Sequence, residues 1–331
     1  FFFHAYAGIP AAQESRGLGD VYKRQVISRS AGNFHRQVLG ENQPVCIFYN
    51  GANAMTATHP KVTAEIRDVF LRDGVVKIPE AISNEWLLTI AEMADAELSA
   101  PGEWVTDTNP GAPTNRLFTS RYRWKTDPLV NRYVYESGVA HMAAALMDSA
   151  TARLYFDHLL VKEPHTEAPT PWHQDVPYWP FLGKQICSAW VSVSELTVEE
   201  SSLEFVRGSH DWGSYFAPEA FDGAKNWTSD FEGEPAPDVA SARDEYDIIG
   251  FEVDPGDAIF FSAWILHGSP GNAGSKRRTA LSTRWLGDDV TWYPHPGSDP
   301  TVTDDDTVVE SGEYPSDDEH FPLVYSVQPL N

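Results

Sequence analysis

The chain has 331 residues and a formal net charge of −24, with 42% hydrophobic and 22% charged residues. This length suits one large domain or two small ones with a buried core, and the composition is that of an ordinary globular protein. So strong an excess of acid repels the phosphates of nucleic acids and of anionic membrane surfaces. We therefore expect neither nucleic acid nor membrane as a partner, and we expect a small-molecule substrate instead.

The number and spacing of the cysteines indicate the cellular compartment. The two cysteines, Cys46 and Cys187, stand far apart and lack the C-x-x-C spacing. They support neither a disulfide framework nor a zinc site built from thiolates. A reducing compartment, and hence a cytoplasmic location, is expected, and no apolar stretch approaches the length of a membrane span. The sequence leaves the oligomeric state open.

The first 54 residues look unlike the rest of the chain. Residues 15–25, SRGLGDVYKRQ, resemble translated adapter sequence of the kind found in assembled sequencing data. The apolar opening lacks the basic region of a signal peptide. We expect residues 1–54 to be a non-native or disordered extension and Met55 to open a single domain over 55–331.

Residues 61–148 form the helical part of this domain. Apolar side chains repeat at helical spacing over 61–72, and a short strand follows at 75–78. Ser83 is a good N-cap for a second helix, which Pro101-Gly102 ends. Residues 103–127 are rich in turn formers and are expected to be irregular. A third helix is predicted over roughly 128–148.

From about 152 to 290, short β-branched and aromatic runs alternate with turn-forming clusters. A long polar insertion covers 211–245, and the acidic tail at about 299–319 is expected to be a solvated loop. Helices followed by many short strands favour an α+β fold. We expect a double-stranded β-helix (a cupin-like jelly roll) with the N-terminal helices packed on one sheet. The predicted strands are 153–162, 170–175, 186–195, 203–206, 257–261 and 278–286.

The chemistry is concentrated around the tripeptide His173-Gln174-Asp175. Two residues apart in a strand, His173 and Asp175 point to the same face and can grip one metal ion. His267, just after an apolar run, can supply the third ligand. Two histidines and one carboxylate on one side of iron leave the opposite positions free for a cosubstrate and O2. By itself, a His-x-Asp tripeptide is equally well read as a strand histidine that is hydrogen-bonded to a neighbouring acid.

Arg278 strengthens the metal interpretation. The run Arg277–Arg284 alternates as a strand, so Arg278 and Arg284 share a face. An arginine that points into a barrel is costly without a carboxylate partner, and a dicarboxylate cosubstrate would supply one. A pair of surface arginines on an edge strand is the alternative, which we favour for Arg277 and leave open for Arg278.

Two stretches carry a recognisable pattern. Residues 171–210, beginning PWHQDVPYWPF, and residues 264–286, WILHGSPGNAGSKRRTALSTRWL, resemble the phytanoyl-CoA dioxygenase family of iron- and 2-oxoglutarate-dependent oxygenases. The similarity runs from about Val62 to Leu286. It comprises the His-x-Asp motif, the His-Gly-Ser after the apolar strand, the arginine eleven residues later, and the turn at Gly208–His210.

The resemblance implies a role for each matching residue. His173, Asp175 and His267 match the iron ligands. Arg278 matches the residue that binds the distal carboxylate of 2-oxoglutarate, Ser269 a hydroxyl that assists it, and Trp190 an aromatic beside it. Fe(II), 2-oxoglutarate and O2 are the implied cofactor and cosubstrates. Many family members have another polar cosubstrate contact upstream, for which Arg121, Arg123 and Lys125 are the open candidates. Ser201-Ser202 departs from the family's usual Asn-Gly, which affects a turn.

Other residues near these motifs have two readings. Tyr178 and Trp179 line a substrate pocket or belong to the core. His210 is read as a turn or pocket-rim residue. Arg284 meets a negatively charged substrate group, or forms a salt bridge to Asp288 or Asp289.

The reaction implied is hydroxylation of an unactivated C–H bond of a small metabolite, with release of succinate and CO2. The alternatives are a desaturase or cyclase variant of the family, or a cupin-like metal-binding protein without turnover. Halogenation is disfavoured because Asp175 occupies the position that halogenases leave to a small residue. The sequence does not identify the substrate.

Overall fold

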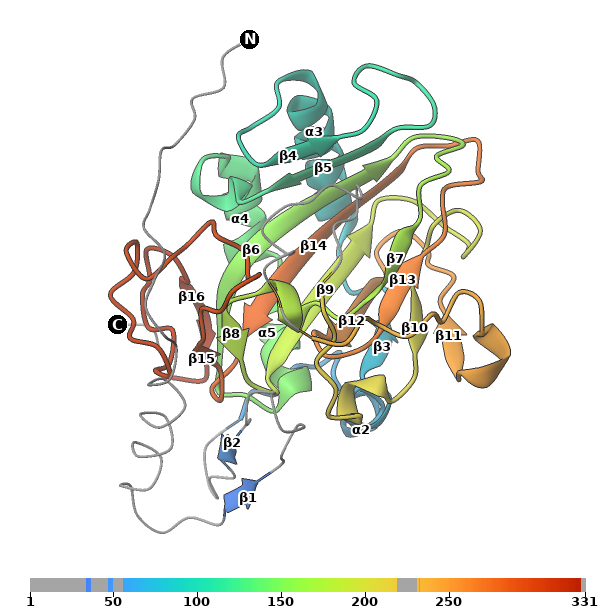
Figure 1. Ribbon diagram of the computed structural model, residues 1–331. Helices are drawn as coiled ribbons and strands as arrows, with labels where there is room; N and C mark the ends of the chain where they lie inside the picture. Colours follow the sequence, from blue (N-terminus) through green and yellow to red (C-terminus); the bar gives the residue numbers. More distant parts are fainter. Residues whose placement is uncertain (1–33, 37–46, 50–55, 219–230, 232, 329–331) are drawn as a thin grey trace, which may run out of the picture.

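The computed structural model describes residues 34–36, 47–49, 56–218, 231 and 233–328, and its sheets are antiparallel (Figure 1). The larger sheet has the order β3-β12-β9-β14-β6-β5-β4, with β16 also paired to β6, and the smaller sheet has the order β11-β10-β13-β7. The larger sheet consists of β3 (Val75–Ile78), β12 (Ala258–Ser262), β9 (Ile186–Ser192), β14 (Arg278–Leu286), β6 (Thr151–Lys162), β5 (Leu117–Arg121), β4 (Val105–Asp107) and β16 (Leu323–Ser326). The smaller sheet consists of β11 (Ile248–Gly250), β10 (Glu204–Val206), β13 (His267–Ser269) and β7 (Thr170–His173). Two further pairs join β8 (Phe181–Leu182) to β15 (Thr291–Trp292) and β1 (Phe34–Arg36) to β2 (Ile47–Tyr49).

Four α-helices lie within the described residues: α2 (Ala64–Asp73), α3 (Asn84–Ser99), α4 (Pro128–Glu136) and α5 (Val139–Met147). The side chain of Thr63 caps the start of α2, and Gly74, at φ 79°, ends it in the left-handed conformation that favours glycine. No helix in the part of the chain that the structure describes is long and apolar enough to cross a membrane.

The larger sheet buries both of its faces. On β9, Ala189 and Val191 pack in the same cluster as Met142 of α5. Trp190, which points to the opposite face, packs instead with Phe261 of β12. This alternation follows from the two-residue period of a strand. The helices therefore pack on one face of the larger sheet, and the opposite face points toward the smaller sheet.

Two expectations about secondary structure need correction. The single helix expected over 128–148 is two helices, because Gly138 adopts φ 83° between α4 and α5. The stretch 103–127, expected to be irregular, contributes β4 and β5 to the edge of the larger sheet. The helix break comes from the backbone conformation of Gly138, and the two strands form because they pair with the larger sheet. The periodicity of side chains reveals neither feature.

The tail at 299–319 is a loop, as expected, but it is not fully solvated. Val302 and Val309 are buried in the same cluster as Trp292, and Asp299 is only 3% exposed. Apolar residues interspersed among the acids therefore anchor the loop. The expectation for residues 1–54 lies outside the described residues except for β1 and β2, and residues 219–230 and 232 of the polar insertion also lie outside them.

Candidate metal centre

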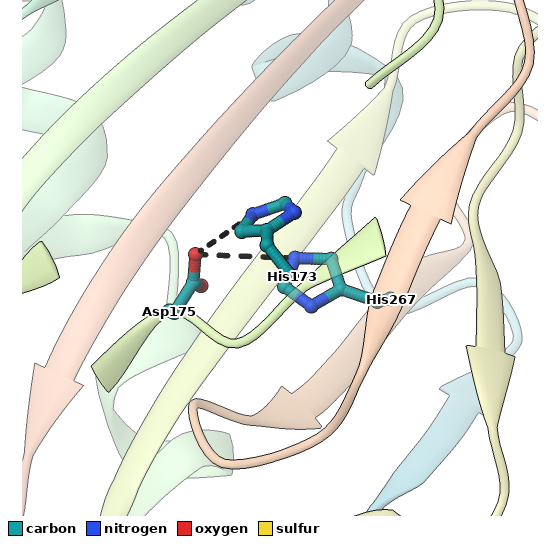
Figure 2. A group of neighbouring side chains, drawn as sticks. All are labelled: His173, Asp175 and His267. Carbon is teal, nitrogen blue, oxygen red and sulfur yellow. Dashed lines mark ion pairs between the residues drawn. The ribbon is translucent and has the colours of Figure 1, made fainter. Parts of the chain in front are cut away.

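The smaller sheet and the segment that follows β7 bring His173, Asp175 and His267 together (Figure 2). His173 ends β7 and His267 begins β13, and the two stand directly opposite each other in the antiparallel pairing of these strands. Asp175 follows β7 by two residues, and its backbone N–H donates to the carbonyl of Ala263 at 2.9 Å. The segment between β12 and β13 thus fixes both the aspartate and the second histidine.

The ligating atoms of the three side chains converge. Nε2 of His173 lies 3.5 Å, and Nε2 of His267 lies 3.9 Å, from Oδ1 of Asp175. One ligand atom from each residue lies within 4.8 Å of the other two, and all three side chains are buried. Three donors at such distances can bind one metal ion, and nitrogen and carboxylate ligands suit iron. The sequence prediction of this cluster therefore agrees with the geometry.

Both imidazoles are oriented by a backbone carbonyl. Nδ1 of His173 lies 2.7 Å from the carbonyl of Pro171, and Nδ1 of His267 lies 3.0 Å from that of Ile265. Since a carbonyl only accepts hydrogen bonds, each Nδ1 carries the proton, which makes Nε2 the ligating nitrogen of each imidazole. Burial, assisted by the neighbouring His173, lowers the pKa of His267 to about 3, which keeps its imidazole neutral. A neutral imidazole is the form that ligates metal.

Asp175 presents one oxygen to the histidines and uses the other for contacts with the protein. Its Oδ2 accepts a hydrogen bond from Ser188 Oγ at 2.9 Å and lies 3.6 Å from Nε of Arg284. Burial alone would raise the pKa of Asp175, but Arg284 and the two histidines together hold it well below its usual value. The carboxylate is therefore ionised, with Oδ1 available to a metal.

Arg284 is buried against aromatic rings. Its guanidinium carbon lies 5.5 Å from the ring centre of Phe156 and 5.6 Å from that of Trp179. The salt bridge to Asp288 or Asp289 considered from the sequence is wrong, because both acids follow the end of β14 and accept hydrogen bonds from other groups. The acidic partner of Arg284 is instead Asp175, on the inner side of the sheet.

Arg278 is a buried cation without an acidic partner among the described residues. It is 2% exposed, and its guanidinium donates to the carbonyl of Leu160 at 3.2 Å and to Ser201 Oγ at 3.3 Å. Its Nε is buried and has no hydrogen-bond acceptor. Burial lowers the pKa of Arg278 only to about 10, so the charge remains at neutral pH. An unsatisfied, buried guanidinium fits a ligand carboxylate.

The other expected cosubstrate residues surround Arg278. The guanidinium carbon of Arg278 lies 5.8 Å from the ring centre of Trp190. Ser269 Oγ donates to Thr170 Oγ1 at 3.1 Å and accepts from Nζ of Lys162 at 3.1 Å. Lys162 is not among the site residues that the sequence predicts. Its position in the two-residue period of β6, on the same face as Leu160, could have revealed an inward-pointing lysine.

The three candidates for a cosubstrate contact upstream of the His-x-Asp motif lie in different places. Arg121 ends β5 opposite His158 of β6, and its Nη1 lies 3.3 Å from Oδ2 of Asp299. Arg123 is paired with Glu97 at 2.7 Å. Lys125 lies over the ring of Trp124. Arg121 is the one of the three that belongs to a strand of the larger sheet, and its cosubstrate role stays a prediction.

Three aromatic residues near the motifs can now be placed. Trp179 is buried beneath Arg284 and belongs to the core. Tyr178 is partly buried, and its ring centre lies 5.6 Å from that of His173, so it adjoins the cluster. His210 instead contacts the end of α2, with Nε2 3.1 Å from the carbonyl of Leu71. It is no part of the metal cluster, in agreement with its reading as a turn residue.

Residues 70–280 match the family model described as phytanoyl-CoA dioxygenase (PhyH). The chain belongs to this family. The match confirms the resemblance found in the sequence motifs. A probable phytanoyl-CoA dioxygenase of Caenorhabditis elegans is 29% identical over 176 residues, which are 50% of this chain and 54% of that protein. The chain thus spans about half the length of this curated relative.

Solved structures with the same fold extend the comparison. SnoK, a non-heme alpha ketoglutarate dependent carbocyclase from nogalamycin biosynthesis, matches with a TM-score of 0.62 at 21% identity, covering 82% of this chain and 100% of its own. EctD from S. alaskensis, solved with 2-oxoglutarate and 5-hydroxyectoine, matches with a TM-score of 0.58 at 16% identity, covering 81% of this chain and 95% of its own. At these identities the likeness establishes the shared fold.

Proposed function

We propose that this member of the phytanoyl-CoA dioxygenase family is an Fe(II)- and 2-oxoglutarate-dependent dioxygenase that hydroxylates an unactivated C–H bond of a small metabolite. The observation that carries the proposal is the convergence of His173, Asp175 and His267 beside a buried Arg278 that has no acidic partner among the described residues. We further propose that the two sheets form a double-stranded β-helix, or jelly roll, around this cluster.

The protein's own groups fit the proposed cofactor. His173 and His267 would each bind iron through Nε2, and Asp175 would bind through Oδ1, because its Oδ2 is already engaged by Ser188 and Arg284. Three protein ligands on one side leave positions for other ligands on the opposite side. Iron, 2-oxoglutarate and O2 together supply the oxidising chemistry, with release of succinate and CO2.

The cosubstrate would be held at its far end. Arg278 would pair with the distal carboxylate through parallel hydrogen bonds, which its planar guanidinium favours. Ser269 would contribute its hydroxyl, and Trp190 would keep water from the guanidinium. A metal-binding protein without turnover would not need this clamp, so the buried Arg278 favours an enzyme.

A desaturase or cyclase is the second candidate for the reaction outcome. The shared fold with the carbocyclase SnoK supports keeping it. Both candidates need the same iron and cosubstrate sites. After the first hydrogen is removed, hydroxylation adds a hydroxyl group to that carbon, whereas desaturation or ring closure removes a second hydrogen. Product analysis by mass spectrometry separates them, because hydroxylation adds one oxygen atom whereas desaturation or ring closure removes two hydrogen atoms.

The decisive test is O2 consumption and succinate formation by the Fe(II)-loaded protein with 2-oxoglutarate and a library of small metabolites. Asp175→Ala should abolish both signals. His165→Asn is the control, because His165 is an exposed histidine outside the cluster. If the wild-type protein binds iron but gives no 2-oxoglutarate-dependent turnover with any substrate class, the enzyme proposal fails in favour of a metal-binding protein.

A further inference from the structure

Lys162 is a buried lysine that has no role in the proposed function described above. It is the last residue of β6, is fully shielded from solvent, and stands directly opposite Arg278, the first residue of β14. Residues that are opposite each other on neighbouring strands point to the same face of the sheet. The amine of Lys162 and the guanidinium of Arg278 therefore lie on the same face of the larger sheet. This is the face that packs against β13, the strand that carries His267.

Neutral oxygen atoms connect the two cations. Nζ of Lys162 donates to Ser269 Oγ at 3.1 Å and to the carbonyl of Pro270 at 2.8 Å. Ser201 Oγ donates to the same carbonyl at 2.8 Å and accepts from Arg278 at 3.3 Å. Within the described residues these acceptors use two of the three ammonium hydrogens and leave Nε of Arg278 without a partner. Donors on both cations thus remain available to an anion.

No carboxylate of the described residues compensates these charges. Glu163, the next residue in the chain, pairs with Arg277 at 2.8 Å on the other side of the strand. Lys162 faces the apolar Leu117 on β5 and Ser269 on β13. Arg278 is the charged group that acts on the amine. Burial, assisted by Arg278, lowers the pKa of Lys162 to about 6. Adjacent buried cations are costly unless an anion joins them.

We propose that Lys162 is a second binding residue for the terminal carboxylate of 2-oxoglutarate, which it holds together with Arg278. This rests on the proposed function, because it takes 2-oxoglutarate as the ligand. One carboxylate oxygen pairs with the guanidinium and the other with the ammonium group. Because the unpaired amine is largely neutral at neutral pH and the paired amine is charged, cosubstrate binding takes up a proton from solvent.

The test is calorimetric titration of 2-oxoglutarate into the anaerobic Fe(II)-loaded protein near neutral pH, in two buffers with different heats of ionisation. The wild-type protein should take up a proton on binding. Lys162→Met should bind 2-oxoglutarate roughly ten- to a hundredfold more weakly, as expected for losing a hydrogen bond to a charged group, and should take up no proton. Lys162→Gln, which keeps a donor to Ser269 without the charge, should show the same loss of proton uptake.

Two controls separate binding from folding. The cosubstrate analogue 2-oxopentanoate chelates metal in the same way but lacks the terminal carboxylate, so Lys162→Met should not change its affinity. Arg277→Gln removes a neighbouring cation that points to the other face, and it should leave 2-oxoglutarate affinity unchanged. The melting temperature of Lys162→Met without ligand should stay close to that of the wild-type protein, since methionine is of similar size and the carbonyl of Pro270 keeps its hydrogen bond from Ser201.

Different results overturn different conclusions. If Lys162→Met binds 2-oxoglutarate as tightly as the wild-type protein, or loses affinity equally for 2-oxopentanoate, Lys162 does not bind the carboxylate. If the wild-type Fe(II) protein fails to bind 2-oxoglutarate at all, the proposed function itself is wrong and the inference falls with it.

Discussion

The hydroxyl of Ser188 donates a hydrogen bond of 2.9 Å to Oδ2 of Asp175, which joins the larger sheet to the carboxylate that follows β7. Ser188 lies on β9 and is completely buried. This bond leaves Oδ1 of Asp175 directed at the two histidines. The larger sheet therefore sets the orientation of the carboxylate, although it contributes none of the three residues of the cluster.

Ser188→Ala should weaken metal binding without abolishing it. Loss of a group that orients a ligand typically costs about 10–100-fold in metal affinity. The measurement is a competitive Fe(II) titration under anaerobic conditions. Ser192→Ala is the matched control, because Ser192 is equally buried on the same strand face but donates to the backbone carbonyl of Ser194. An equal loss in both variants would show that general packing, and not the bond to Asp175, supports the metal.

Arg278→Ala should separate cosubstrate binding from metal binding. The variant removes the buried cation nearest Trp190, and losing one partner of a buried charge pair costs on the order of 2–5 kcal/mol. This corresponds to at least about 30-fold in the dissociation constant of 2-oxoglutarate. Spectroscopic titration of the anaerobic Fe(II) protein measures it, and Fe(II) affinity should stay within about twofold. Unchanged 2-oxoglutarate affinity would direct attention to Arg121 or Arg284 as the anchor.

The residues of the metal cluster were predictable from the sequence by two short-range rules. The two-residue period of a strand predicts His173 and Asp175 on one face, and the apolar run before His267 predicts a buried strand that leads to it. In the structure β7 ends at His173 and Asp175 has helical backbone angles, so Asp175 is held by its backbone hydrogen bond to Ala263 and not by strand alternation. The pairing of β7 with β13, which sets His267 opposite His173, is a long-range contact. The sequence gives no local signal for it, so the convergence was an inference from ligand chemistry.

Other features were not predictable, for identifiable reasons. The partner of Arg284 is set by which side of the sheet its side chain occupies, and nearness in sequence wrongly favoured Asp288 and Asp289. β4 and β5 are strands because they extend the edge of the larger sheet, although their sequence is rich in turn formers. Lys162 becomes conspicuous only when the register of β6 and β14 places it opposite Arg278.

Substituting Gly138, between α4 and α5, should change the free energy of unfolding. The sign of that change distinguishes two separate helices from one continuous helix. Gly138 has φ 83° and no atom within 4 Å of an added Cβ, so Gly138→Ala brings backbone strain without a clash. The left-handed conformation costs a non-glycine residue about 1–2 kcal/mol, and urea unfolding should show that loss. Gly138→Asn should cost less, because asparagine tolerates this conformation. If 128–148 were one continuous helix, alanine would instead stabilise the protein by about 0.5–1 kcal/mol.

Asp157 predicts a pH dependence of stability. It is 1% exposed on β6, and its carboxylate accepts the backbone N–H groups of Trp124 at 2.8 Å and Arg123 at 3.2 Å. Burial raises the pKa of Asp157 to about 6, against the opposing effect of these hydrogen bonds. Between about pH 4 and pH 6 the folded protein therefore holds a proton that the unfolded chain releases. The contribution of Asp157 to stability falls as pH rises through this window and is constant above it.

The test of this pH dependence compares urea unfolding of the wild-type protein and Asp157→Asn from about pH 4 to pH 7. Asparagine cannot accept both N–H groups, so the variant should be less stable throughout. Its deficit should shrink as pH rises, by at most about 3 kcal/mol for two pKa units, because only the wild-type protein loses the proton. Asp317→Asn is the control of opposite sign: although burial opposes it, hydrogen bonds from His320 and Thr307 lower the pKa of Asp317 to about 2. For this second variant the unfolding series is extended down to about pH 2, and its stability deficit should grow as pH rises from about 2 to 4, where the folded acid ionises before the unfolded one. From about pH 4 to pH 7 its deficit should stay constant. A deficit for Asp157→Asn that does not change with pH would mean that Asp157 is already ionised at pH 4 in the folded protein.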